Sequence, residues 1–161
     1  MSLAKEYEKI IKQTFEVVPD VSIMRLYDPT SSFAGIKNIC DYELYVHPYL
    51  IFLECKTSAG NTWNFSNLSS KQLEGMLEKS QITGILAGVI LWFYEKDITI
   101  FVDIIEIKRL IDAGYKSINA SKLDEIEHIV VKGQKKRTYF EYDGNNFKTL
   151  LKRASYRRWC K

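Results

Sequence analysis

Two predicted strands meet at a proline turn in residues 40–56, which read CDYELYVHPYLIFLECK. The strands cover about 39–46 and 49–56, and His47-Pro48 joins them. A connection with an even number of residues makes facing positions sum to 95, which sets Asp41 across from Glu54. Because side chains alternate along a strand, one face then carries acidic residues and the other is apolar enough to be core. The first face holds Asp41, Glu43, Phe52, Glu54 and Lys56, and the second holds Tyr42, Leu44, Ile51, Leu53 and Cys55.

The facing carboxylates of Asp41 and Glu54 are the chemically informative pair. Facing residues of antiparallel strands have Cα atoms only about 4.5–5.5 Å apart, so two carboxylates there repel and destabilise the hairpin. A hard cation between them relieves the repulsion, and Mg²⁺ prefers one or two carboxylates plus waters and substrate phosphates. Lys56 would lie beside the metal and hold a water or stabilise developing charge. The pattern indicates metal-assisted phosphodiester hydrolysis, with plain solvent contacts of a strand end as the alternative.

The spacing of Glu54 and Lys56 is not informative without this context. The same spacing recurs at Glu106 and Lys108. That second pair falls in a predicted helix, where residues i and i+2 point apart, so we expect a solvated helix face there.

The rest of the chain alternates helical and extended patterns. Apolar residues at helical spacing predict a helix over 4–15, and Ser69 with Gln72 forms a capping-box pattern that starts another over 70–83. A nearly continuous apolar run over 86–94 predicts a strand covered on both faces. Further segments are a strand over 21–27, a loop over 28–38, a polar connection over 57–68, a strand over 98–102, a helix over 104–113, weak strands over 129–132 and 138–142, and a helix over 145–154. We expect one mixed α/β domain spanning 1–161.

Charge is distributed unevenly over the 161 residues, whose net charge is +3. Residues 1–131 hold 13 Lys/Arg and 18 Asp/Glu, whereas residues 132–161 hold 10 Lys/Arg and two acids. A basic segment with interleaved aromatic residues favours nucleic acid as partner, and a solubilising tail is the alternative. The predicted DNA contacts in this segment are Lys135, Lys136, Arg137, Lys152, Arg153, Arg157 and Arg158. Such contacts make affinity fall steeply with salt.

Several protein classes are excluded. No apolar run approaches the ~18 residues that span a bilayer, and the N-terminus carries no hydrophobic signal region. The three cysteines are far apart and odd in number, which predicts neither a disulfide framework nor a zinc site. We therefore expect a cytoplasmic protein without membrane contact.

The order of these residues resembles the RecU-type Holliday junction resolvases of the PD-(D/E)xK nuclease superfamily. The likeness covers about residues 4–103, and its motifs are Cys40-Asp41-Tyr42, residues 49–57, Asn64-Phe65, Asn67-Leu68, residues 71–76 and residues 84–93. The resemblance implies a restriction-endonuclease-like core, a mixed central β-sheet flanked by helices. It also implies a homodimeric, Mg²⁺-dependent enzyme, with Mn²⁺ as a substitute, that nicks opposing strands of a four-way DNA junction.

The resemblance also assigns roles to residues. Asp41 and Glu54 would be metal ligands with the Cys55 carbonyl as a third, and Lys56 would position the water. Glu8 on the first helix would complete the acidic cluster, with Glu6 as its rival, and Gln72 would lie near the active site. Near the site, Thr57, Ser58 and Lys71 are candidates for phosphate contacts. Trp63 either stacks on a base or packs locally.

The sequence departs from the family pattern in three places. Cys40 precedes the aspartate where a threonine is usual, and Lys71 precedes the glutamine where a histidine is common. Only 32 residues separate Glu8 from Asp41, which leaves little room for the family's projecting stalk. A short form would suit a bacteriophage-encoded or otherwise minimal resolvase in a bacterial or infected host cell. The alternatives are another nuclease on the same fold (nickase, flap or restriction-type) and a non-catalytic DNA-binding module.

Overall fold

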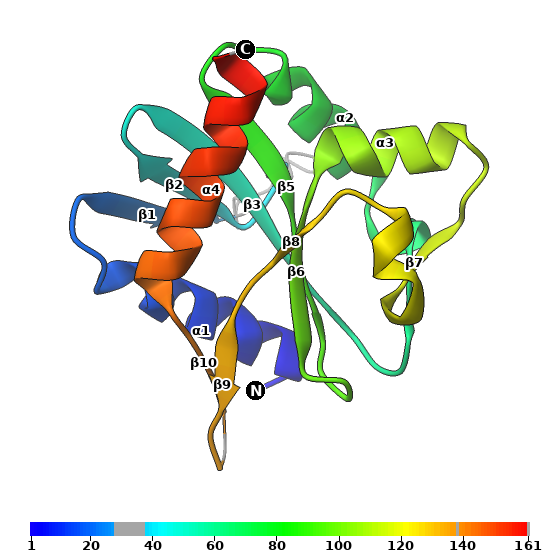
Figure 1. Cartoon of the computed structure of the whole chain (residues 1–161), viewed down its shortest axis with the longest axis horizontal. Helices are drawn as coiled ribbons and strands as arrows, with labels where there is room; N and C mark the ends of the chain where they lie inside the picture. The colour runs from blue at the N-terminus through cyan, green and yellow to red at the C-terminus, as the bar shows by residue number, and fades with distance from the viewer. Residues whose placement is uncertain (28–37, 138, 161) are drawn as a thin grey trace, which may run out of the picture.

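Strand β5 (Ile85–Phe93) lies in the middle of a six-stranded mixed sheet in the computed structural model of this chain (Figure 1). The strand order is β1-β2-β3-β5-β6-β8. β3 and β5 run parallel, and all other neighbours in this sheet are antiparallel. Every residue of β5 after Ile85 is buried, which confirms the predicted strand covered on both faces.

The structure describes residues 1–27, 38–137 and 139–160, so most of the predicted loop over 28–38 lies outside the described residues. The α-helices are α1 (Leu3–Glu16), α2 (Ser70–Ser80), α3 (Ile104–Asp112) and α4 (Gly144–Trp159). The other strands of the main sheet are β1 (Val21–Arg25), β2 (Tyr42–Val46), β3 (Tyr49–Ser58), β6 (Ile98–Asp103) and β8 (Ile129–Val130). Smaller elements are β4 (Thr62–Asn64), β7 (Ser117–Asn119), β9 (Gly133–Lys135), β10 (Phe140–Tyr142) and the 3₁₀ helices η1 (Phe65–Asn67) and η2 (Ala120–Glu125).

The β2–β3 hairpin has the predicted register. Tyr42 pairs with Leu53 and Val46 with Tyr49, so facing positions sum to 95 as expected. The regular ladder stops at the Tyr42–Leu53 pair, one residue short of Asp41. There the Asp41 N–H donates to the Leu53 carbonyl (3.1 Å), and the Cys55 N–H is taken by the Asp41 carboxylate in place of a backbone carbonyl. β2 therefore begins at Tyr42, later than the predicted start near residue 39.

Both faces of the main sheet are covered, each by its own hydrophobic core. α1 and α4 pack on the face that carries Tyr42, Leu53 and Cys55, and Figure 1 shows α4 crossing this face. The opposite face packs against α2 and α3. At the hairpin, this α2/α3 side of the sheet is the face that was expected to carry acidic residues and be polar. That expectation is wrong for Phe52, which is buried in the same apolar cluster as Met76 of α2.

The predicted polar connection over 57–68 is also wrong, since it contains β4 and η1. β4 pairs with β7, and this pairing buries Trp63, whose side chain is 1% exposed. The Trp63 ring packs edge-on against Phe65 with 5.9 Å between ring centroids. Because the ring is buried, it is not available to stack on a base, and of the two predicted roles local packing is the one observed.

The predicted solvated face of the 104–113 helix is wrong at Glu106. This carboxylate is 5% exposed and receives two hydrogen bonds from Arg109, from Nε (2.7 Å) and Nη2 (2.6 Å). It also accepts the Glu127 N–H at 3.1 Å. A buried acid with three donors is a structural feature.

α4 extends to Trp159, beyond the predicted end near residue 154. In the part of the chain described, no helix has the length and apolar character needed to cross a bilayer.

Candidate active site

Glu54 lies at the centre of the site, near the middle of β3, where it is 3% exposed. Its Oε1 accepts a hydrogen bond from Gln72 Nε2 (2.7 Å) and forms an ion pair with Lys56 Nζ (2.8 Å). Lys56 reaches Glu54 because residues i and i+2 of a strand lie on the same face. The predicted neighbourhood of Glu54, Lys56 and Gln72 is therefore observed.

Asp41 joins this group from the other strand of the hairpin. Its Oδ2 accepts the Cys55 N–H at 2.8 Å, which places the carboxylate beside the peptide that links Glu54 to Cys55. Burial and the nearby Glu54 carboxylate raise the pKa of Asp41 to about 7, although the Cys55 N–H acts in the opposite direction. Burial also raises the pKa of Glu54, opposed by Lys56 and Gln72. The two acids are thus neighbours in a site that is short of positive charge.

The second oxygen of Glu54 indicates what the site lacks. Among the residues that the structure describes, Glu54 Oε2 is buried and has no hydrogen-bond partner. A buried unpartnered carboxylate oxygen is costly. Two carboxylates with one buried free oxygen form a donor set that suits a hard divalent cation such as Mg²⁺. The residues present therefore fit the metal that the sequence predicts.

Gln72 has two structural roles. Its backbone N–H donates to Ser69 Oγ (3.1 Å) and its side-chain oxygen accepts from the Ser69 N–H (3.1 Å), which is a complete capping box at the start of α2. The same side chain donates to Glu54 through Nε2. The cap holds the amide in place, and the amide in turn fixes the orientation of the Glu54 carboxylate.

Glu8 lies within electrostatic reach of Asp41 and Glu54 and is paired with a cation. Its Oε2 pairs with Arg25 Nη2 at 2.5 Å, and the Arg25 guanidinium also donates to the Tyr42 hydroxyl (3.0 Å). The Tyr42 hydroxyl in turn donates to the Glu8 carbonyl at 2.9 Å. Within residues 1–27, 38–137 and 139–160, no three His, Cys, Asp or Glu side chains lie close enough to hold a metal ion. Arg25 binds the Glu8 carboxylate, and the negative charge of Glu8 still raises the pKa of both Asp41 and Glu54, so its role in the acidic cluster stays a prediction.

Sequence reasoning missed Arg25 and Tyr42. A signal exists in the alternation of β1, because Arg25 occupies a position on the same side as the half-buried Val21 and Ile23. A cation at an inward position of a strand needs an anionic partner, and Glu8 supplies it.

The predicted DNA contacts lie in several places. Thr57 and Ser58 end β3, and the Ser58 hydroxyl donates to the Thr62 carbonyl at 2.7 Å. Lys71 is exposed in the first turn of α2, next to Gln72. The other predicted contacts fall into two groups, Lys135, Lys136 and Arg137 on the β9–β10 hairpin and Lys152, Arg153, Arg157 and Arg158 on α4.

The two basic groups lie in different surroundings. In the hairpin, Lys135 pairs with Asp97 (3.0 Å) and Lys136 with Glu141 (3.3 Å). The α4 group lies on the sheet face opposite the one toward which Glu54 points. The structure therefore does not bring the α4 group together with the carboxylates.

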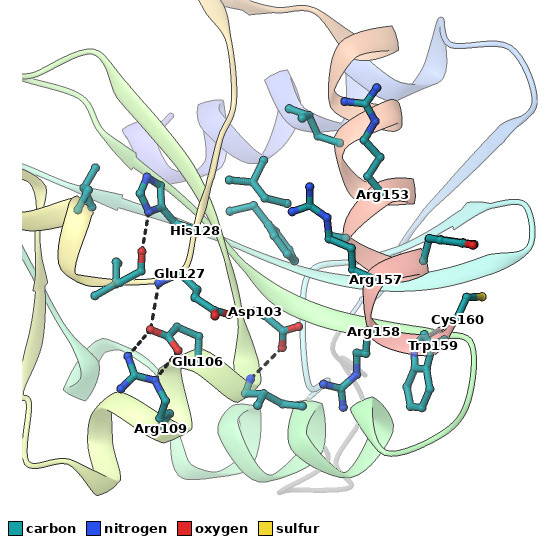
Figure 2. Close-up of a pocket in the computed structure, with 18 of the residues that line it drawn as sticks. Asp103, Glu106, Arg109, Glu127, His128, Arg153, Arg157, Arg158, Trp159 and Cys160 are labelled. Atoms are coloured by element: carbon teal, nitrogen blue, oxygen red, sulfur yellow. Dashed lines mark hydrogen bonds and ion pairs between the residues drawn. The ribbon is translucent and has the colours of Figure 1, made fainter.

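A large cavity lies away from the carboxylate site. It is a groove of about 1330 Å³ whose walls come from α3, the segment after η2, and α4. Figure 2 shows Arg153 and Arg157 extending from α4 on one wall and Asp103 and Glu127 on the other. The carboxylate site lies instead between α2 and the β2–β3 hairpin, and none of its residues lines this groove.

Comparisons with known proteins identify a family and solved structures with a similar fold. The family model described as "RecU: Recombination protein U" matches residues 10–142. One of these structures is Hjc, a Holliday junction resolvase of Archaeoglobus fulgidus, with 14% sequence identity and a TM-score of 0.49, over 71% of this chain and 85% of that one. No curated protein matches the chain. The family match includes Asp41, Glu54, Lys56 and Gln72 and ends just before α4.

Proposed function

The chain belongs to the recombination protein U family, and on that premise we propose that it is a structure-selective DNA endonuclease that resolves four-way (Holliday) junctions. The observation that carries the chemistry is the buried, unpartnered Oε2 of Glu54, whose carboxylate interacts electrostatically with that of Asp41. Hydrolysis of a phosphodiester needs charge stabilisation and an activated water, and the residues around this oxygen are suited to provide both.

Asp41 and Glu54 would hold Mg²⁺, or Mn²⁺ as a substitute, with the Cys55 carbonyl as a further ligand. A bound divalent ion polarises the phosphoryl oxygen and lowers the pKa of a bound water. Metal binding needs both carboxylates ionised, so their raised pKa values make it stronger as the pH rises.

Lys56 and Gln72 set up the site in different ways. Both donate to the same oxygen of Glu54, which leaves the other oxygen available to bind a cation. The Lys56 side chain is 22% exposed, so part of it is open to solvent beside Glu54. There it can hold the attacking water and stabilise the negative charge that develops on the phosphate. Gln72, held by the α2 cap, acts as a positioning residue.

Resolution of a junction requires two cuts, one in each of two opposing strands. The described residues of one chain hold one such group of carboxylates, so we propose that two copies act together in a homodimer with two-fold symmetry. Paired nicks follow from that symmetry, because a four-way junction can present two equivalent strands to two equivalent sites.

The test is cleavage of a labelled four-way junction with Mg²⁺ or Mn²⁺. We expect symmetric nicks from the wild type and none from Asp41→Asn. Glu43→Gln is the matched control, since it removes one negative charge two residues further along the chain, and we expect it to retain cleavage. No cleavage with either metal would overturn the proposal, and binding without cleavage would indicate a DNA-binding module. Equal cleavage of junction, flap and linear duplex would indicate another nuclease on this fold.

A further inference from the structure

Helix α4 carries five cations and no acidic residue. Two of them have partners within the chain, since Lys148 donates to the Pro19 carbonyl (2.8 Å) and Arg158 to the Ser80 carbonyl (2.8 Å). The other three cations are exposed. In the described part of the chain, neither a hydrogen bond nor an ion pair engages their side chains. These three, Lys152, Arg153 and Arg157, surround Tyr156, which is 58% exposed, and the four residues are called the α4 ridge here.

Helix stability does not account for the α4 ridge. The helix dipole favours cations in the last turn, which covers Arg157 but not Lys152 or Arg153 in the middle of the helix. Arg153 and Arg157 are four residues apart, and like charges at that spacing destabilise a helix by about 0.2–0.5 kcal/mol. An anionic partner removes this repulsion. A row of cations beside an exposed aromatic ring is the surface that binds a nucleic-acid backbone.

The position of the α4 ridge relative to Glu54 limits what that nucleic acid can be. α4 packs through Phe147 and Leu151 on one face of the main sheet, whereas Glu54 is held by Gln72 on the other. The sheet itself therefore separates the ridge from the site of cleavage. A straight duplex that is cut beside Glu54 cannot also lie along the outer side of α4. A branched substrate can, because a second arm leaves the branch point in a different direction.

We propose that the α4 ridge binds the phosphate backbone of a DNA arm other than the arm being cut, and that it thereby contributes to the preference for branched DNA. The inference rests on the proposed function for the identity of the substrate. The ridge lies beyond residues 10–142, so it is not part of what the family match covers.

The acidic residues across the groove favour the outer surface of α4, and not the interior of the groove, as the place where DNA phosphates bind. Across the groove, Asp103 caps α3 through the Ile105 N–H (2.9 Å), and Glu106 is engaged by Arg109 (Figure 2). Phosphates deep in the groove would meet these acids, whereas phosphates on the ridge meet only cations. The acidic wall would instead suit the ridge of a second copy, and the experiment below separates that occupant from DNA.

The experiment compares Arg153→Gln/Arg157→Gln with Lys116→Gln/Lys122→Gln, which removes the same charge from exposed positions outside α4. Both are made in the Asp41→Asn background, and binding to a four-way junction and to a linear duplex is measured by anisotropy over a range of NaCl concentrations. We expect the α4 variant to lose roughly tenfold in junction affinity at about 0.1 M salt, and its plot of log K against log salt to flatten by about 2, since each phosphate contact contributes about 0.9. Its ratio of junction to duplex affinity falls, while the control keeps both affinities. Arg153→Lys/Arg157→Lys keeps the charge and restores most of the junction affinity.

Unchanged junction affinity and slope in the α4 variant would overturn the inference, and so would an equal loss for junction and duplex. A change of oligomeric state in sedimentation, in place of a change in DNA affinity, would assign the ridge to a protein interface and also overturn it. The proposed function is judged separately by cleavage in the wild-type background. If the wild type does not cleave, the affinity measurements still test whether the α4 ridge binds DNA. If the α4 variant keeps its DNA affinity, the dependence of cleavage on Asp41 still tests the proposed function.

Discussion

Replacing Asp41 by Asn is predicted to stabilise the metal-free protein while it abolishes cleavage. The native pKa of Asp41 is about 7 against 3.8 for the free side chain, with burial as the main cause and Glu54 next. About 3 pKa units at 1.36 kcal/mol each set a ceiling of roughly 4 kcal/mol for the destabilisation by the ionised carboxylate. Asp41 is half-buried, so solvent screening lowers this figure. The Asn carbonyl can still accept the Cys55 N–H, and we expect a net gain of about 2 kcal/mol at pH 8.

The sign of the pH dependence follows from the raised pKa. Below about pH 4 the Asp41 carboxyl is protonated in both the native and the unfolded chain, so it contributes no penalty. Between about pH 4 and 7 the unfolded chain ionises first, and the stability of the wild type falls as the pH rises. Above pH 7 the penalty is complete. The advantage of Asp41→Asn is therefore largest at pH 8 and disappears toward pH 4.

Urea and thermal unfolding in EDTA at pH 4, 6 and 8 measure this prediction. A gain of about 2 kcal/mol corresponds to a rise in Tm of roughly 4–8 °C for a chain of this size. Glu43→Gln again serves as control, and we expect no such gain from it. An Asn variant that is no more stable than the wild type at pH 8, or whose advantage does not change with pH, would refute the physical account of the site.

Three further substitutions test other parts of the structure. Lys56→Met is expected to lower the rate of junction cleavage by about 10²–10³, while Mg²⁺ still raises the Tm, since both carboxylates remain. Arg25→Ala leaves the Glu8 carboxylate without its partner, and because the two side chains are 29% and 15% exposed we expect a loss of about 2–3 kcal/mol in urea unfolding, partly restored by adding Glu8→Gln. Gly88→Ala places a Cβ 2.4 Å from the Val102 carbonyl oxygen in the neighbouring strand, so we expect the free energy of unfolding to fall by about 3 kcal/mol. A variant as stable as the wild type would show that β5 and β6 are less tightly paired than described.

The sequence was sufficient to predict the parts of the fold that depend on local patterns. The register of the β2–β3 hairpin followed from an even-numbered turn and alternating side chains, and the α2 cap followed from Ser69 and Gln72. The pair Glu54 and Lys56 followed from strand alternation alone.

What the sequence did not reveal depends on contacts between distant segments. Trp63 is buried because β4 pairs with β7, more than fifty residues later in the chain, and no local pattern marks that pairing. Glu106 is buried by the segment that carries Glu127. The pairing of Glu8 with Arg25 depends on how α1 packs on the sheet, which the resemblance of single motifs does not specify.

The most direct test of the site is anomalous diffraction from crystals of the protein soaked in Mn²⁺. We predict a single strong peak between the Asp41 carboxylate and Glu54 Oε2, about 2.0–2.3 Å from the ligating oxygens, with Lys56 close by. A map in which Mn²⁺ binds elsewhere, while Lys56 remains paired with Glu54 and no ion lies beside Asp41, would contradict the assignment of these residues as a metal-dependent nuclease site.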